Sequence, residues 1–153
     1  MYNIQVMSYK QALEYVYNYS GSKEHEKYAI ISIQEFTNGY GIGLEFKKGG
    51  NCLGALNIEF SDITKEIDSS EVKLMTLEDA QNIHDFVDSL PDEVEKLIVH
   101  CYAGVSRSAA VAAGIAQVKF GDDKEYFKKY VPNMHVYYKI LEVYGLSNKY
   151  SKD

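Results

Sequence analysis

The order of apolar and polar positions predicts strands and helices that alternate along the chain. Four short runs rich in apolar and β-branched residues predict strands at residues 2–7, 28–34, 52–60 and 96–100. The segments between and after these runs predict helices at residues 8–19, 77–90, 108–120, 124–130 and 133–144. This alternation favours an α/β fold with a central, mostly parallel sheet flanked by helices.

The predicted helix at residues 77–90 has the clearest local signals. Thr76 and Asp79 have the spacing of a capping box at its start, and Pro91 follows its end. Its apolar residues fall on one helical stripe, formed by Leu77, Ala80, Ile83, Val87 and Leu90. These signals together predict an amphipathic helix that ends before Pro91.

A glycine-rich stretch separates the second and third predicted strands. Gly39, Gly41 and Gly43 form a G-x-G-x-G run after a strand. A dinucleotide-binding loop of this type leads into a helix, whereas residues 44–48 (LEFKK) predict a strand. The stretch is therefore interpreted as a flexible hairpin within a turn region, and not as a nucleotide site.

Length and composition indicate a globular domain. The chain has 153 residues, of which 46% are hydrophobic and 25% charged, enough to bury a core. No apolar run approaches the roughly 18 to 20 residues that span a bilayer, and the first ten residues lack the pattern of a secretory signal. We expect one domain over residues 1–153.

The cysteines and histidines do not form a metal or disulfide pattern. The two cysteines, Cys52 and Cys101, have no CxxC spacing, and the four histidines are scattered. We expect neither a metal nor a cofactor, and we interpret Cys52 as a core thiol without a redox partnership with Cys101. Sparse cysteine is typical of an intracellular, reducing compartment, so a cytoplasmic location is expected.

The charge balance disfavours polyanionic partners. Sixteen basic and 22 acidic residues give a net charge of −6, which argues against nucleic acids and anionic membranes as partners. Arg107 is the one arginine, and all other basic residues are lysines. That guanidinium lies in the most informative segment of the chain.

This segment, residues 100–108 with the sequence HCYAGVSRS, lies between a predicted strand and a predicted helix. Backbone N–H groups of such a loop, with the N-terminus of the following helix, bind anions. Gly104 permits a conformation that other residues resist, and the fork of Arg107 matches two phosphate oxygens. Cys101 in this positive setting should be a thiolate. The combination indicates phosphoryl transfer through a cysteinyl-phosphate.

The segment resembles the HCxxGxxRS signature of the cysteine-based protein tyrosine phosphatases. The signature lies about two-thirds along a short chain. This position is similar to that in the dual-specificity-phosphatase-like branch, especially in its small prokaryotic and viral members. The resemblance extends from residue 28 to residue 141 and is sharp only at the signature. It implies a strand–P-loop–helix active site and metal-independent hydrolysis of phosphotyrosine, with phosphoserine and phosphothreonine left open.

The resemblance also implies roles for single residues. Cys101 is expected to be the nucleophile, and Arg107 the phosphate clamp. Ser108 is expected to stabilise the leaving thiolate, and His100 to orient the loop. Phosphate binding is assigned to the whole loop, which comprises Tyr102, Ala103, Gly104, Val105, Ser106 and Arg107. Tyr102 is expected to border the substrate entrance.

A carboxylic acid is also needed to protonate the leaving oxygen. The segment at residues 57–63 resembles the Phe-Asp-Asp-Ile pattern of small bacterial members, with Ser61 at the first aspartate position. It makes Asp62 the first candidate. Asp68 is the competitor, because its spacing from Cys101 is nearer the commonest family spacing. Asn133, at a Pro-Asn helix start, is interpreted as a packing residue, with a positioning role left open.

Two other functions remain open at this stage. The first is a phosphate-binding pseudophosphatase or adaptor. The second is the same chemistry on a non-protein phosphoester, although the loop has Tyr102 and Val105 where lipid phosphatases favour lysine, and the charge disfavours RNA. The expected partner is a phosphorylated protein or peptide. The oligomeric state stays open, and a monomer is compatible with the sequence.

Overall fold

Four strands form one parallel sheet in the computed structural model, which describes residues 2–19, 26–38 and 44–146. The strands are β1 (Asn3–Met7), β2 (Tyr28–Gln34), β3 (Cys52–Glu59) and β4 (Lys96–His100). Their order in the sheet is β1-β4-β2-β3, and each neighbouring pair is parallel. The predicted α/β fold is confirmed, and the predicted strands match within one residue at each end.

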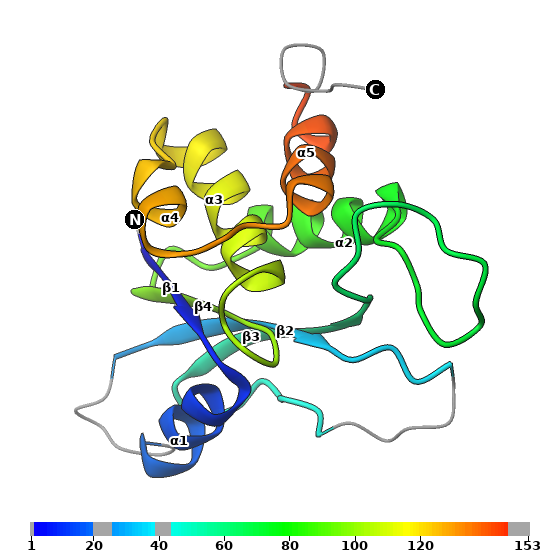
Figure 1. The fold of residues 1–153 in the computed structure, drawn as a ribbon. Helices are drawn as coiled ribbons and strands as arrows, with labels where there is room; N and C mark the ends of the chain where they lie inside the picture. Colours follow the sequence, from blue (N-terminus) through cyan, green and yellow to red (C-terminus); the bar gives the residue numbers. More distant parts are fainter. Residues whose placement is uncertain (1, 20–25, 39–43, 147–153) are drawn as a thin grey trace.

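Five helices cover the two faces of this sheet (Figure 1). They are α1 (Tyr9–Tyr19), α2 (Leu77–Asp88), α3 (Arg107–Phe120), α4 (Lys124–Lys129) and α5 (Met134–Val143). Helix α1 lies on one face, and α2 to α5 lie on the other (Figure 1). None of the helices in the described ranges is long and apolar enough to cross a bilayer.

The strands read as nearly continuous apolar runs because both faces of the sheet are buried. In β2, Ile31 and Ile33 belong to the core under α2, α3 and α5. Tyr28 and Ile30, which point to the opposite face, belong to the smaller core under α1. The sheet is therefore held from both sides, and its strand ends are fixed in position.

Helix α3 is buried along most of its length. Its residues from Arg107 to Ala116 are all buried, and most are small. A Cβ atom on Gly114 would lie 2.6 Å from Cγ2 of Ile140, so α5 packs directly on the α3 backbone. Helix α3 is thus clamped between the sheet and α5, which fixes the loop that precedes it.

Two predicted elements need correction. The capping box of Thr76 and Asp79 is confirmed, but Leu77 is 47% exposed because the buried stripe of α2 begins one turn later. The strand predicted at residues 44–48 is wrong. The backbone N–H and C=O of Phe46 bond to the side-chain amide of Asn57 at 3.0 and 2.9 Å, and this amide replaces a pairing strand. The run of Gly39, Gly41 and Gly43 lies outside the described residues.

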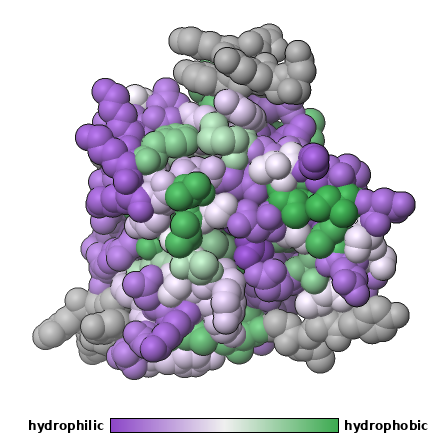
Figure 2. All heavy atoms as spheres, viewed as in Figure 1, coloured by the Kyte–Doolittle hydropathy of each residue, from purple (hydrophilic) through white to green (hydrophobic). Residues whose placement is uncertain are grey.

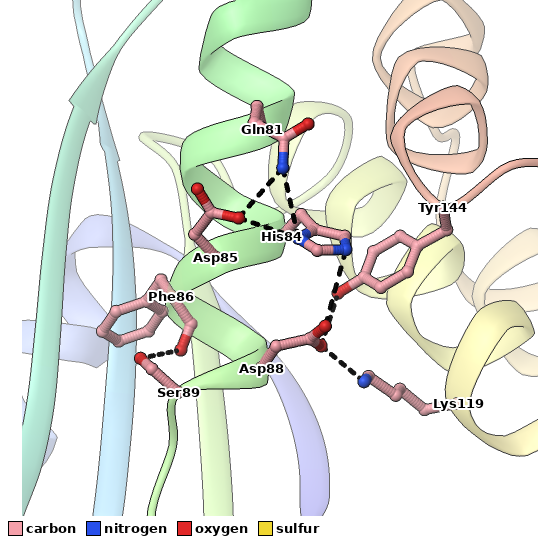
Figure 3. A network of polar contacts seen from close by, with 8 residues as sticks. All are labelled: Gln81, His84, Asp85, Phe86, Asp88, Ser89, Lys119 and Tyr144. Carbon is pink, nitrogen blue, oxygen red and sulfur yellow. Dashed lines mark hydrogen bonds and ion pairs between the residues drawn. The ribbon is translucent and has the colours of Figure 1, made fainter.

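A polar network joins α2 to the neighbouring helices (Figure 3). His84 lies between the carboxylates of Asp85 and Asp88, at 3.0 and 3.5 Å. Lys119 of α3 donates to Asp88 at 2.6 Å, and the ring of Tyr144, which follows α5, lies 4.4 Å from the His84 ring. Because Lys119 is near the C-terminus of α3, the network braces the helices at the end away from the HCYAGVSRS loop.

Candidate active site

The carboxyl ends of all four strands contribute to one site. The loop at residues 101–106 joins β4 to α3, and the other strands end close to it. Tyr9, after β1, donates its backbone N–H to Tyr102 O at 3.0 Å. Glu35 follows β2, and Asp62 follows β3. In open parallel α/β sheets this edge is where ligands bind.

Cys101 is buried at the centre of the loop, and its surroundings favour the thiolate. Its Sγ lies 3.1 Å from Oγ of Ser108 and accepts the N–H of Gly104 at 3.3 Å. Burial raises the pKa of the thiol. Hydrogen bonds from the Ser108 hydroxyl and from the N–H groups of Ser108 and Gly104, with the charge of Arg107, outweigh it and hold the pKa below its ordinary value. A thiolate favoured in this way is chemically able to act as a nucleophile.

Gly104 is required by the loop geometry. Its φ is +73°, and a Cβ atom there would lie 2.6 Å from Ser8 N and 2.7 Å from Met7 C. Any other residue would be strained and would also meet the backbone at the end of β1. This close packing fixes the N–H that Gly104 points at the sulfur.

The N-terminus of α3 is left without a side-chain cap. Ser106 is the N-cap residue, but its hydroxyl donates to Oδ1 of Asp62 at 2.9 Å and accepts no N–H of the helix. The first N–H groups of a helix have no partner within the helix. In α3, the N–H of Ser108 bonds to the Cys101 sulfur, and the positive end of the helix favours an anion at the loop.

The guanidinium of Arg107 is buried and held by two acceptors. Nη1 donates to the carbonyl of Phe60 at 3.0 Å, and Nη2 forms an ion pair with Oε1 of Glu35 at 2.6 Å. Nε is also buried, and within the described residues it has no hydrogen-bond partner. A buried unpaired N–H is costly, so this donor needs an acceptor that a bound oxyanion would supply.

The role of Glu35 in this arrangement was missed by sequence reasoning. A signal was present, because Glu35 directly follows the predicted strand at residues 28–34 and lies at the edge that carries the loop. A buried arginine also requires a counter-charge. Spacing alone did not show which of the 22 acidic residues supplied it.

Asp62 is hydrogen-bonded to the loop, whereas no such bond is found for Asp68 among the described residues. Oδ1 of Asp62 accepts from Ser106 Oγ at 2.9 Å and from Nδ2 of Asn133 at 2.8 Å. Asn133 also donates to Ile63 O at 3.0 Å, and its Oδ1 caps α5. Asp62 and Asp68 are both exposed, but in the described part of the chain no hydrogen bond joins Asp68 to the loop. The geometry thus favours Asp62 and gives Asn133 a positioning contact beyond simple packing.

His100 is buried behind the loop as a neutral ring. Its Nδ1 lies 3.2 Å from Cys101 O, and its Nε2 lies 2.6 Å from Ser32 Oγ. Because a carbonyl can only accept, Nδ1 carries the proton, and Nε2 accepts from the Ser32 hydroxyl. Burial lowers the pKa of His100, which keeps the ring neutral. Both ring nitrogens are occupied, so His100 can orient the Cys101 backbone.

The mouth of the site carries exposed apolar side chains. Tyr102 is 69% exposed and Val105 42%, and Val105 O accepts the N–H of Val131, which is 73% exposed. Figure 2 views the face with the loop and the α4–α5 connection, where strongly hydrophobic atoms form small groups among hydrophilic ones. The exposure of Tyr102 agrees with its expected place at the entrance.

Cys52 lies at the amino end of β3, at the opposite end of the strands from the loop. It pairs with Tyr28 at the start of β2, whereas His100, before Cys101, pairs with Ser32. Tyr28 and Ser32 are four residues apart on β2, so the two ends of the strand are about 13 Å apart, well beyond the reach of a disulfide. Burial raises the pKa of Cys52, which makes it an unreactive core thiol. Within the described residues, no three His, Cys, Asp or Glu side chains group to hold a metal ion.

The pH dependence of alkylation tests the environment of Cys101. We expect iodoacetamide to modify Cys101 with a midpoint below the roughly 8.5 of a free thiol. Deprotonation must precede attack, so the rate rises as the pH rises through this lowered pKa. Ser108→Ala removes the strongest lowering interaction and should move the midpoint to higher pH. Peptide mass spectrometry separates Cys101 from Cys52, the internal control, and equal midpoints in both proteins would contradict this account.

Comparison with known proteins agrees with the fold. No family model matches the sequence, and no curated protein matches it. A human tyrosine phosphatase-like serine/threonine/tyrosine-interacting protein matches the structure with a TM-score of 0.60 and 19% identity, over 94% of this chain and 91% of that one. Tk-PTP in its active form matches with a TM-score of 0.54 and 13% identity, over 95% and 90%. The chain therefore has a dual-specificity-phosphatase-like fold.

Proposed function

We propose that residues 1–153 form one phosphatase domain that hydrolyses phosphate monoesters through a cysteinyl-phosphate, without a metal. Phosphotyrosine in a protein or peptide is the first substrate. The observation that carries the proposal is the buried Cys101 sulfur, which accepts the N–H of Gly104 at 3.3 Å beside a buried arginine with an unpartnered Nε. The proposed setting is the cytoplasm, where a reducing environment preserves the thiolate.

Binding uses the loop and the start of α3. The N–H groups of residues 102–106 surround the phosphate oxygens, and the α3 N-terminus adds positive potential. Nε of Arg107 donates to a phosphate oxygen while Phe60 and Glu35 keep the guanidinium in place. These donors also stabilise the charge that the equatorial oxygens carry in the transition state.

Hydrolysis then proceeds in two steps. The Cys101 thiolate attacks phosphorus, and the substrate oxygen leaves with a proton from the Asp62 carboxyl. In the second step, Asp62 takes a proton from water as the water oxygen attacks phosphorus, and the Cys101 thiolate leaves. The Ser108 hydroxyl, 3.1 Å from the sulfur, stabilises the departing thiolate. The Cys101 thiolate, the Asp62 carboxyl and the loop return to their starting states.

The hydrogen bonds of Asp62 specify which oxygen carries the proton. Oδ1 already accepts from Ser106 and Asn133, so Oδ2 is the oxygen that holds and returns the proton. Asn133 links this carboxylate to the N-terminus of α5, and Ser106 links it to the loop. The acid is thereby held at a fixed distance from the nucleophile.

A phosphate-binding protein without turnover is the second candidate. It is favoured by one observation, the likeness to a human protein described as phosphatase-like and interacting. Turnover of matched phosphotyrosine and phosphoserine peptides separates the candidates. We expect vanadate-sensitive release of phosphate that persists with a chelator. Binding of both peptides without phosphate release would favour the second candidate, and loss of activity with the chelator would contradict the metal-free mechanism.

Asp62 and Asp68 are distinguished by the dependence on the leaving group. Asp62→Ala should lower kcat on phosphotyrosine peptides by roughly 10²–10⁴-fold, the typical contribution of one positioned acid. The loss should be smaller with an activated aryl phosphate, whose leaving oxygen needs less protonation. Asp68→Ala is the matched control and should retain activity. A larger loss in Asp68→Ala than in Asp62→Ala would reverse the assignment.

A further inference from the structure

A pocket of about 180 Å³ lies beside the catalytic loop. Its walls are largely apolar and include Tyr9, Ile33, Thr37, Leu44, His100 and Tyr102. A dry cavity of roughly 150 Å³ is large enough to hold benzene. This pocket therefore has room for one aromatic or branched aliphatic group.

The pocket adjoins the phosphate site but does not coincide with it. His100 and Tyr102 flank Cys101 in the chain and line the pocket, and Glu35, the ion-pair partner of Arg107, lies on its wall. Neither Cys101 nor Arg107 lines it. A group in this pocket is thus next to a phosphate held by the loop, and it belongs to a neighbouring part of the same ligand.

We propose that this pocket binds an apolar side chain adjacent to the phosphorylated residue of a peptide or protein substrate. The inference rests on the proposed function and adds a specificity to it. Apolar walls favour a side chain such as leucine or phenylalanine, whose transfer from water is favourable, over a polar one of similar size. The exposed Tyr102 ring, at the border of pocket and loop, then contacts both residues of the substrate.

The charges at the rim restrict the substrate further. Glu35 lines the pocket with its side chain 60% exposed. Oε1 of Glu59 accepts the N–H and the hydroxyl of Thr37, another wall residue. The Glu35 charge is paired with Arg107, so an acidic residue beside the apolar one would be repelled mainly by the Glu59 carboxylate. The preferred substrate therefore has an apolar neighbour and no acidic residue on that side.

A peptide series tests this pocket through binding as well as turnover. Phosphotyrosine peptides carry leucine or asparagine in turn at each of the two positions on either side of the phosphorylated residue. Their affinity for Cys101→Ser protein and their kcat/KM with the wild type are measured. At one position we expect leucine to be favoured by about tenfold, the lower end of what burial of such a side chain supplies.

Two leucines of equal exposure provide the variant and its control. Leu44, on the pocket wall, and Leu146, after α5, are both 39% exposed. Leu44→Asp should bring the leucine preference close to one, because a carboxylate replaces part of the apolar wall. Leu146→Asp should keep the tenfold preference, since it introduces the same charge at an equally exposed position that does not line the pocket.

The outcomes separate this inference from the proposed function. If the wild type prefers leucine over asparagine by a factor near one at every position, the proposed role of the pocket is wrong. A leucine preference that Leu44→Asp leaves intact would also contradict it. Equal losses with p-nitrophenyl phosphate and with all peptides in Leu44→Asp would show that the pocket holds the phosphorylated ring itself, which also overturns it. Absence of turnover with an intact leucine preference in binding would contradict the phosphatase proposal and support the pocket.

Discussion

Replacing Cys101 with serine is expected to lower the turnover of phosphate monoesters by at least about 10⁴-fold, the scale of losing a covalent nucleophile. The serine hydroxyl keeps the shape of the site but is not ionised by the hydrogen bonds that lower the pKa of Cys101. The measurement is kcat/KM with a phosphotyrosine peptide, together with the peptide affinity of the variant. Binding should be retained, because the loop N–H groups and Arg107 are unchanged.

Cys52→Ala is the matched control for this variant. Cys52 is also buried, and it lies at the opposite end of the strands from the loop. The Cys52→Ala protein should retain turnover. The unfolding midpoint of each variant shows separately whether its thermal stability is reduced. Substantial activity in Cys101→Ser would contradict a mechanism that begins at this sulfur.

The second large effect is expected for Arg107→Lys, with a roughly 10²–10³-fold loss of kcat/KM, as for the removal of one preorganised donor. The charge is kept, but an ammonium is a compact donor without the planar fork. It cannot bond Phe60 O and Glu35 and still offer the donor that Nε provides. The loss should appear in kcat with activated and ordinary substrates alike.

Glu35→Gln provides a milder comparison at the same contact. The amide oxygen still accepts from Nη2 of Arg107, whereas the negative charge is lost, so the guanidinium plane is held less firmly. We expect a smaller loss than for Arg107→Lys, with a similar unfolding midpoint. Activity of Arg107→Lys within threefold of the wild type would show that charge alone serves this site.

The fold was predictable where local pattern and burial agree. Strands β2 and β4 are buried on both faces, so their apolar runs stand out from the surrounding sequence. The capping box of α2 is formed by Thr76 and Asp79, which are close in the chain. The strand predicted at residues 44–48 failed because its pairing depends on the side chain of Asn57, which no local pattern shows.

The site was predictable only in part for the same reason. The signature gathers the sulfur, the guanidinium and the loop N–H groups within nine consecutive residues, so sequence alone located them. The contacts that hold these groups join distant segments. Glu35 is 72 residues from Arg107, and Asn133 is 71 residues from Asp62. The order of strands in the sheet brings Glu35 and Asp62 to one edge, and the packing of α5 on α3 and α2 brings Asn133 there.

Trapping the covalent intermediate tests the proposed cysteinyl-phosphate mechanism without assuming a particular substrate. Wild-type protein is mixed with excess of an isotopically labelled aryl phosphate, quenched in acid within one turnover, and digested for peptide mass spectrometry. We expect labelled phosphate on Cys101 and none in Cys101→Ser treated in the same way. Turnover without covalent phosphate on the quenched protein, or labelled phosphate on another residue such as Ser108, would contradict this mechanism.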